Sequence, residues 1–194
     1  MEKLVYLTTN KYKIEEANRH FVKRHGLKIE IKNPSFRVPE IQAESSIEVV
    51  KHSVKYAAEK IKRAVLKSDT ALYINYLGGL PGPYNAYFDK QIGIDKFLKM
   101  MGDVKERGAR LEHSFGFCEP GKDPIIFTGG SRGKISLEAR GVRGRWHDLF
   151  YIPNGETKTL SQLREEDELY EAQFWGTAIN DFVKWYRNHL KNKR

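Results

Sequence analysis

The sequence predicts an α/β fold in which helices flank a mixed β-sheet, and three observations lead to this prediction. Apolar runs of strand length alternate with amphipathic stretches of helix length through the first half of the chain. The second half contains two strand-like stretches joined by a short turn, a pattern typical of antiparallel pairing. A long helical stretch then follows. Because both kinds of connection occur, the sheet should be mixed. We expect one domain over residues 1–194, with two lobes and a central cleft between them.

The first half opens with residues 4–7, an unbroken apolar run that predicts a buried strand. A helix should extend from about residue 11 to residue 23, because apolar side chains recur on one face. Gly26 is a suitable stop for this helix. Residues 27–31 alternate between apolar and charged side chains, which indicates a half-buried strand.

A long helix is expected next, over about residues 45–66. Ser45 and Glu48 have the spacing of a capping box, in which each side chain bonds to the other residue's backbone. A further strand is expected at residues 70–76. This boundary places Asp69 at the edge of a β-rich run.

The second half contains a predicted strand pair and the helices that follow it. Cys118, the only cysteine, lies in the first of the paired strands; it excludes an internal disulfide and should be a buried thiol rather than a nucleophile. The expected elements are a helix near residues 94–101, strands at 110–118 and 124–137 joined by a turn at 119–123, an irregular stretch at 141–153, and helices at 160–165 and 170–190.

The composition, 40% hydrophobic and 30% charged, is that of a soluble globular protein. No apolar run approaches the roughly 20 residues that span a bilayer, and the start of the chain has no signal-peptide pattern. We therefore expect a cytoplasmic protein with no membrane partner. The net charge of +9 either attracts phosphates or belongs to a solvated surface. The sequence contains no nucleic-acid recognition motif, which makes nucleic acid an unlikely partner.

The first candidate site is the strand-to-helix junction that contains Thr8, Asn10 and Lys13. Unpaired backbone N–H groups and the positive end of a helix dipole favour anions at such a junction. Lys13 adds a positive charge one turn into the helix. The alternative is that Thr9 or Asn10 only caps the helix and that Lys13 is solvated.

The second candidate site combines two carboxylates that are distant in the sequence, Glu40 and Asp69. Two such groups, with water and phosphate oxygens, suit Mg²⁺. An ionised Asp69 beside a metal-bound phosphate could orient or deprotonate a water molecule. The loop at residues 78–83 reads Gly-Gly-Leu-Pro-Gly-Pro, which is more rigid than an ordinary surface turn requires. In the alternative interpretation, Asp69 caps a turn and Glu40 faces solvent.

The third candidate site is the glycine-rich and aromatic region that contains Trp146 and Asp148. Gly129, Gly133 and Gly144 permit tight turns and a close approach of backbone to a ligand. Trp146 could stack on a base or pack in the core, and the sequence favours neither. His147 lies between Trp146 and Asp148, but no second histidine lies at zinc-ligand spacing from it, so no zinc site is expected.

In this order and spacing, these motifs resemble those of the inosine triphosphate pyrophosphatase family, over Leu4 to Ile179. The matching pieces are Thr8-x-Asn10-x-x-Lys13, Pro39-Glu40-Ile41-Gln42, Asp69-Thr70 with Gly78-Gly79-Leu80-Pro81-Gly82-Pro83-Tyr84, and Arg140-Gly141 with Asp148. The resemblance implies a long bent mixed sheet between helical lobes, usually in a homodimer. It also implies Mg²⁺-dependent hydrolysis of inosine or xanthosine triphosphate to the monophosphate and pyrophosphate.

The resemblance also implies a role for each matching residue. Thr8, Asn10 and Lys13 would bind phosphates. Glu40 and Asp69 would bind the metal, and Asp69 would also be catalytic by activating the attacking water. These roles agree with the chemistry inferred from the residues, since phosphoanhydride hydrolysis depends mostly on positioning and charge neutralisation.

The residues that would recognise the base depart from the family pattern. Gly-Arg-Trp-His-Asp-Leu at residues 144–149 replaces the usual Gly-Phe-Gly-Tyr/Trp-Asp-Pro, and Gln-Phe-Trp at residues 173–175 replaces Ser-His-Arg. The new side chains cannot reproduce the donor fork of the lost arginine. We expect Trp146, Asp148, Phe174 and Trp175 to contact the base, with altered or relaxed base choice. The alternative is a catalytically impaired nucleotide-binding protein in which the aromatic residues fill the pocket.

Overall fold

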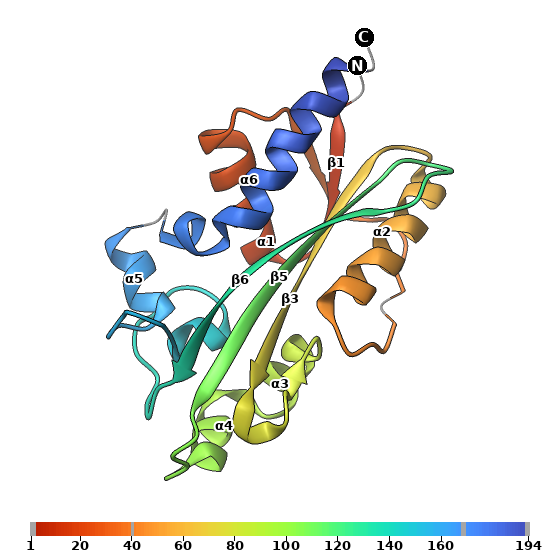
Figure 1. The fold of residues 1–194 in the computed structure, drawn as a ribbon. Coiled ribbons are helices and arrows are strands. Elements are labelled where there is room, and N and C mark those ends of the chain that lie inside the picture. Colours follow the sequence, from red (N-terminus) through yellow and green to blue (C-terminus); the bar gives the residue numbers. More distant parts are fainter. Residues whose placement is uncertain (1–2, 40, 168–169, 193–194) are drawn as a thin grey trace. The chain divides into compact units, whose positions relative to one another are not determined.

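Seven strands form one mixed sheet in the computed structural model, which describes residues 3–39, 41–167 and 170–192 and, within them, all side chains except those of residues 171–176 (Figure 1). β1 is parallel to β2 and to β3, whereas β4 is antiparallel to β3 and β7 to β6. The predicted mixed sheet is therefore confirmed. The strand order is β2 (Ile29–Lys32), β1 (Leu4–Leu7), β3 (Val65–Ile74), β5 (Gly108–Cys118), β6 (Ile125–Ile135) and β7 (Tyr151–Pro153), with β4 (Pro81–Gly82) paired to β3.

Helices connect these strands, and none in the described part of the chain is long and apolar enough to cross a membrane. Polar side chains cap several of them; Ser45, for example, accepts a hydrogen bond from the backbone N–H of Glu48. The helical elements are α1 (Lys11–Ala17), the π-helix η1 (Asn18–Arg24), α2 (Ser46–Ile61), the 3₁₀-helix η2 (Asn75–Leu77), α3 (Asn85–Gln91), α4 (Gly93–Met101), the 3₁₀-helix η3 (Trp146–Leu149), α5 (Leu160–Glu166) and α6 (Tyr170–Lys191).

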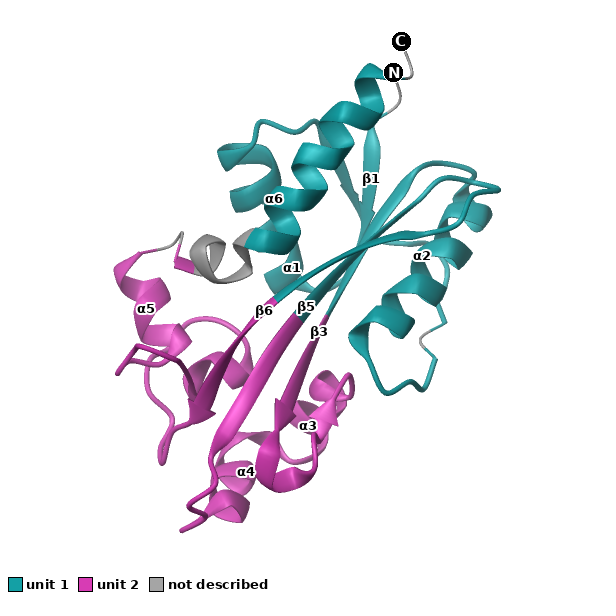
Figure 2. Cartoon of the chain, in the orientation of Figure 1, with its two compact units in different colours: residues 1–69, 113–129, 176–194 teal, residues 70–112, 130–175 magenta. Residues whose placement is uncertain are grey.

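The chain divides into two compact units, and each is described by itself (Figure 2). Unit 1 contains residues 1–69, 113–129 and 176–194. Unit 2 contains residues 70–112 and 130–175. Strands β3, β5 and β6 contribute residues to both units.

One face of the unit 1 sheet is covered by α2 (Figure 2). Val54 and Ala57 of α2 join Val5, Val65 and Cys118 of the strands in a fully buried apolar cluster. The prediction of a buried thiol at the only cysteine is therefore confirmed. Gly116 also faces α2, because an added Cβ there would collide with a valine side chain of the helix.

The opposite face of the unit 1 sheet packs against η1 and α6 through aromatic side chains. Phe21 of η1 makes edge contacts with Tyr6 of β1, Phe115 of β5 and Phe182 of α6, at ring-centroid distances of 6.2, 5.5 and 5.6 Å. Neighbouring strand residues point to opposite faces, so Val5 meets α2 while Tyr6 meets η1. This alternation fixes β1 between two helical layers, and α1 follows directly from its end.

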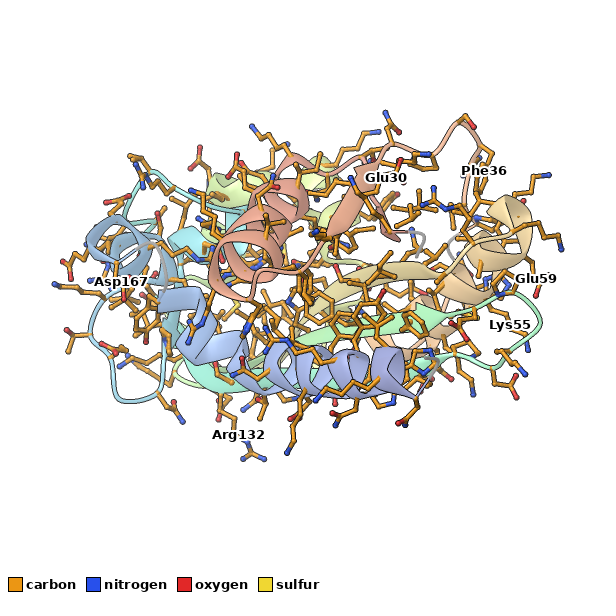
Figure 3. All side chains as sticks on the ribbon, turned by 90° about the horizontal axis from the view of Figure 1, so that it is seen from above. Glu30, Phe36, Lys55, Glu59, Arg132 and Asp167 are labelled. Atoms are coloured by element: carbon orange, nitrogen blue, oxygen red, sulfur yellow. The ribbon has the colours of Figure 1, made fainter. Side chains whose placement is uncertain are left out.

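The turn between β5 and β6 is attached to α2 (Figure 3). Lys55 pairs with Asp123 at 2.8 Å, and Glu59 accepts a hydrogen bond from the backbone N–H of Gly121. Both helix residues lie beside this turn in Figure 3. Because these contacts are solvent-exposed, they position the turn more than they stabilise the fold.

Unit 2 has a separate aromatic core. Phe97 of α4 packs against Trp146 and Phe150, with ring-centroid distances of 5.2 and 4.8 Å. Gly133 of β6 lies against the β7 backbone, where an added Cβ would collide with the carbonyl oxygen of Ile152. The glycine spacing in β6 therefore serves packing of the protein's own chain at this position.

Two predicted boundaries were wrong. The helix expected over residues 45–66 ends at Ile61, where Lys62 adopts the left-handed conformation at φ +53°. The apolar residues that follow belong to β3 instead, which begins at Val65. Short apolar runs fit a helix or a buried strand equally well, and here the run belongs to a buried strand. Asp69 consequently lies within β3 rather than at its edge.

Besides η2 and β4 at the glycine-rich loop, three short elements were not anticipated: α3, η3 and β7. The helix α3 follows the glycine-rich loop directly, and η3 and β7 occupy the stretch expected to be irregular. Each is stabilised by contacts with residues far along the chain, such as the β7 ladder with β6. Local sequence patterns carry little information about such elements.

Candidate functional site

The junction between β1 and α1 is organised by hydrogen bonds from polar side chains. Thr8 Oγ1 accepts from the backbone N–H of Asn10 at 3.1 Å. Asn10 Oδ1 accepts from the N–H groups of Tyr12 and Lys13, at 2.9 and 3.4 Å. Asn10 is thus the N-cap of α1, as the capping interpretation held, whereas its expectation that Lys13 is solvated was wrong. Its role in binding phosphate stays a prediction.

Lys13 reaches from the first turn of α1 to the middle of β3. Its Nζ donates to the backbone oxygen of Ser68 at 2.6 Å and lies 3.8 Å from Asp69 Oδ1. The Ser68 hydroxyl is in turn hydrogen-bonded to the Tyr6 hydroxyl of β1, at 2.6 Å. Residues of α1, β1 and β3 therefore meet around the pair formed by Lys13 and Asp69. The Lys13 and Asp69 side chains remain 18% and 22% exposed, so both are accessible from solvent.

The structure brings together Thr8, Asn10, Lys13 and Asp69 in unit 1; we call these four residues the junction cluster. Glu40, the second predicted metal ligand, lies outside the described residues. Among the described residues, no group of three or more His, Cys, Asp or Glu side chains could hold a metal ion. This excludes an all-protein metal cage from the described part of the chain, but Mg²⁺ commonly needs only one or two carboxylates beside substrate phosphates. The Asp69 carboxylate, whose side chain is 22% exposed, fits such a site.

In unit 2, Asp148 is fully buried at the end of a charged network. Its Oδ2 accepts from the backbone N–H of Arg145 at 2.5 Å and forms an ion pair with Arg164 of α5. Its Oδ1 lies 3.4 Å from His147 Nε2. Gly144, at φ +98°, leaves room for this pair, because a Cβ there would collide with the Asp148 carboxylate. Only glycine satisfies both the backbone conformation and the space.

The Asn85 side chain connects Trp146 to His147. The Trp146 indole N–H donates to Asn85 Oδ1 at 2.8 Å, and an indole can only donate. The amide nitrogen of Asn85 therefore points at His147 Nδ1, 2.9 Å away, which must accept. In a neutral ring, this arrangement places the His147 proton on Nε2, toward Asp148. We call Asn85, Trp146, His147, Asp148 and Arg164 the buried network.

The predicted base-binding residues are thus in different situations. Trp146 is 6% exposed and packs edge-on against Phe97 and Phe150, which is the core-packing alternative for this side chain. Asp148 has no exposed surface. The side chains of Phe174 and Trp175 lie outside the described residues. Contact of any of these residues with a base stays a prediction.

Sequence reasoning did not identify Asn85 or Arg164. Asn85 follows the glycine-rich loop and resembles an ordinary helix-start residue. Arg164 stands before four acidic residues in the sequence, which is typical of a solvated helix face, yet it is 5% exposed. Asn85 and Trp146 are separated by 61 positions, so no local pattern reveals their contact.

Comparison with known proteins agrees with the motifs. The model of the Ham1 family matches residues 4–185. A dITP/XTP pyrophosphatase of Methanopyrus kandleri is 34% identical, over 98% of this chain and 100% of its own. Another of the same name, from Methanosarcina mazei, is 33% identical, over 96% of this chain and 98% of its own.

A solved structure shares the fold. The HAM1 protein of Coxiella burnetii superposes with a TM-score of 0.79, covering 97% of this chain and 100% of its own, at 22% sequence identity. The family resemblance seen in the motifs is confirmed by the match over nearly the whole chain. This chain belongs to the Ham1 family.

Proposed function

We propose that this protein hydrolyses nucleoside triphosphates with nonstandard purine bases, such as inosine and xanthosine, to the monophosphate and pyrophosphate. The observation that carries the proposal is the pairing of Lys13 with Asp69 beside the start of α1. The names of the relatives, dITP/XTP pyrophosphatases, support the same reaction. We further propose that the reaction uses Mg²⁺ and that base choice is altered or relaxed.

In this proposal, Lys13 neutralises the triphosphate tail. Its ammonium group lies at the amino end of α1, where the helix dipole also favours negative charge. A hydrogen bond from Nζ to the Ser68 backbone oxygen and the proximity of Asp69 hold the side chain in place. An ammonium held in this way stabilises the charge that develops on phosphate oxygens without having to reorganise.

Asp69 would orient and deprotonate the water that attacks the α-phosphorus. Its carboxylate is a candidate general base because it is accessible and has a cation 3.8 Å away, which favours the ionised form. Asp69, together with Glu40, would also hold the divalent ion. When bound, Mg²⁺ would supply positive charge that offsets the negative charge of the phosphate groups.

The proposal is tested with a panel of triphosphates. Purified protein with Mg²⁺ is incubated with ITP, XTP, dITP and the four standard triphosphates, and pyrophosphate and orthophosphate are measured separately. We expect pyrophosphate from the inosine and xanthosine substrates. Release of orthophosphate alone, or no release from any nucleotide, would contradict the proposal.

A binding protein without turnover is the second candidate. The burial of Asp148 and Trp146 favours it, since a closed interior would leave little of either side chain for a base. Thermal shift with each nucleotide separates the two cases, because any ligand of the native state raises the melting temperature. Stabilisation by a nucleotide that is never hydrolysed would support the binding role.

We also propose a homodimer, on the basis of the family resemblance. Light scattering after size-exclusion chromatography should give about twice the chain mass of 22.5 kDa. A mass that stays at the monomer value across a hundredfold range of concentration would contradict this.

A further inference from the structure

An open groove in unit 1 lies between the end of η1 and the C-terminal half of α6. Its volume is about 490 Å³, within the range of small-molecule sites. It is separate from the junction cluster, since Lys13 lies in the first turn of the continuous helical segment Lys11–Arg24 and His25 lies just past its end, on the order of 20 Å away along the helix. The residues that line the groove are His25, Asn180, Val183, Lys184, Arg187, Asn188, Leu190 and Lys191.

The spacing of the α6 residues places them on one side of the helix. Asn180, Lys184, Arg187 and Lys191 follow one another at intervals of four, three and four, the periodicity of a helix face. Val183 and Leu190 add apolar surface to the groove. The sequence thus assembles cations and amides over an apolar floor, a composition typical of sites that bind a polar ligand.

Arg187 is hydrogen-bonded to the backbone at one end of the groove. Its Nη2 donates to the backbone oxygen of His25 at 2.7 Å. The chain reverses there, because Gly26 has a φ of +63° and its N–H donates to Val22 O at 2.9 Å. A guanidinium has five N–H donors, so the contact with His25 fixes its position and leaves further donors for a ligand or water.

The charge of the groove is unbalanced. Of the described residues that line it, none is acidic, and Asp181, the nearest acid along α6, is not among them. Burial, followed by the adjacent positive charges of Arg24 and Arg187, lowers the pKa of His25. Like charges three and four positions apart on a helix repel each other, and a bound anion would relieve this repulsion.

A simpler explanation accounts for only part of this charge. Cations in the last turn of a helix are stabilised by the negative end of its dipole, which explains Lys191. The effect fades within one turn, so it does not explain Lys184 or the anchored Arg187. The helix dipole therefore accounts for neither Lys184 nor the guanidinium donors of Arg187 that do not contact His25.

We propose that this groove binds a small anion that carries phosphoryl groups, with pyrophosphate as its simplest form. Fixed N–H donors and clustered ammonium groups are the chemistry that recognises phosphoryl oxygens. The volume admits a pyrophosphate or a nucleotide. The inference does not depend on the proposed hydrolysis, because it concerns binding at residues outside the junction cluster.

The test measures pyrophosphate binding by isothermal titration calorimetry, without divalent metal and at constant ionic strength. All proteins carry Lys13→Gln, which weakens binding at the junction cluster. The groove variant adds Lys184→Gln and Lys191→Gln. Its matched control adds Lys51→Gln and Lys60→Gln, two exposed positions on α2, so that both have the same net charge.

We expect the groove variant to lose at least tenfold in affinity and the control to stay within twofold of the Lys13→Gln protein. Both should melt at the same temperature, since the altered lysines are exposed. Arg187→Lys should give an intermediate loss, because it keeps the charge but not the fork of donors. Equal losses in the two variants would mean a diffuse charge effect and would overturn the proposal.

Two further arms identify the ligand class. A nucleoside monophosphate tests whether one phosphoryl group suffices, and weaker binding than pyrophosphate is expected from its lower charge. A short single-stranded oligonucleotide tests the phosphodiester alternative. Binding of the oligonucleotide through the groove lysines, with no binding of pyrophosphate, would also overturn the proposal.

Discussion

The junction cluster and the buried network each hold an aspartate beside a cation, but in opposite environments. Asp69 and Lys13 are 3.8 Å apart with about a fifth of each side chain exposed. Asp148 and Arg164 are in direct contact, with 0% and 6% of their side chains exposed. The comparison teaches that burial, rather than the pairing of charges, separates a pair available to a ligand from one that organises the interior.

The energetics of the two pairs differ accordingly. A solvent-exposed ion pair contributes about 0–1 kcal/mol to stability, and the partly exposed pair of Lys13 and Asp69 should cost less to alter than a fully buried pair. Removal of one partner of a buried pair leaves an uncompensated charge, at a cost of about 3–5 kcal/mol. Substitutions in the two clusters should therefore affect different observables.

The largest effect is expected from Asp69→Asn on turnover. The amide keeps the size of the side chain but cannot accept the proton of water, so kcat should fall by about 10²–10⁴-fold. Nucleotide binding and the midpoint of denaturation should change little, because the side chain is accessible. Single-turnover kinetics and calorimetry measure the two properties. Undiminished kcat in this variant would remove Asp69 as the catalytic base.

The next effect is expected from Arg164→Met on stability. Loss of the guanidinium leaves Asp148 buried without its cation, and the free energy of unfolding should fall by about 3–5 kcal/mol. Urea denaturation measures this value. The double variant Arg164→Met/Asp148→Asn is the control; it should recover part of the loss, because the neutral amide needs no counter-charge. A single variant as stable as the wild type would show that the pair is not structural.

A smaller effect is expected from Trp146→Phe. The phenyl ring preserves most of the packing, but Asn85 Oδ1 loses its indole donor, at a cost of about 1–3 kcal/mol. If Trp146 serves the interior, KM for the nucleotide should remain within about twofold. Trp185→Phe is the matched control, because Trp185 of α6 packs against Phe117 and Phe182 in unit 1. A large rise in KM with unchanged stability would instead favour stacking on a base.

The smallest effect is expected from a pair of substitutions at Asn10. Asn10→Asp keeps the cap of α1, so stability should change by less than about 0.5 kcal/mol. The new charge would repel a phosphate by about 1 kcal/mol at 4 Å in water, and KM should rise about fivefold. Asn10→Ala should cost about 1 kcal/mol of stability. If Asn10→Asp leaves KM unchanged, the residue caps the helix without meeting phosphate.

The N-terminal part of the fold was predictable because its signals are local. The apolar run of β1, the N-cap at Asn10 and the cap at Ser45 depend on residues within a few positions of one another. The start of β3 was not predictable, since Val65 and Leu66 fit the end of a helix as well as a buried strand. Because of that ambiguity, the prediction placed Asp69 at the edge of the strand, whereas the structure places it within the strand.

The candidate site was predictable only in part. Lys13 and Asp69 were identified by their chemistry and by the family motif, although 56 positions separate them in the sequence. The buried network depends on the fold itself: Asn85, His147 and Arg164 have no common periodicity or spacing. The amino-acid type of a polar residue does not reveal whether its side chain is buried with a partner or solvated, and only the tertiary structure distinguishes the two cases.

The hydrogen bonds around Asn85 have a single direction. Donors lead from the indole of Trp146 through the amide of Asn85 to the imidazole of His147, which turns its remaining proton toward Asp148. The indole N–H can only donate a hydrogen bond and the carboxylate can only accept one. The opposite order of donors and acceptors is therefore impossible. Successive bonds of one polarity reinforce each other. The loop after β6 therefore contains two hydrogen bonds of one polarity, which begin at the indole of Trp146 and end at the imidazole of His147, 3.4 Å from the Asp148 carboxylate.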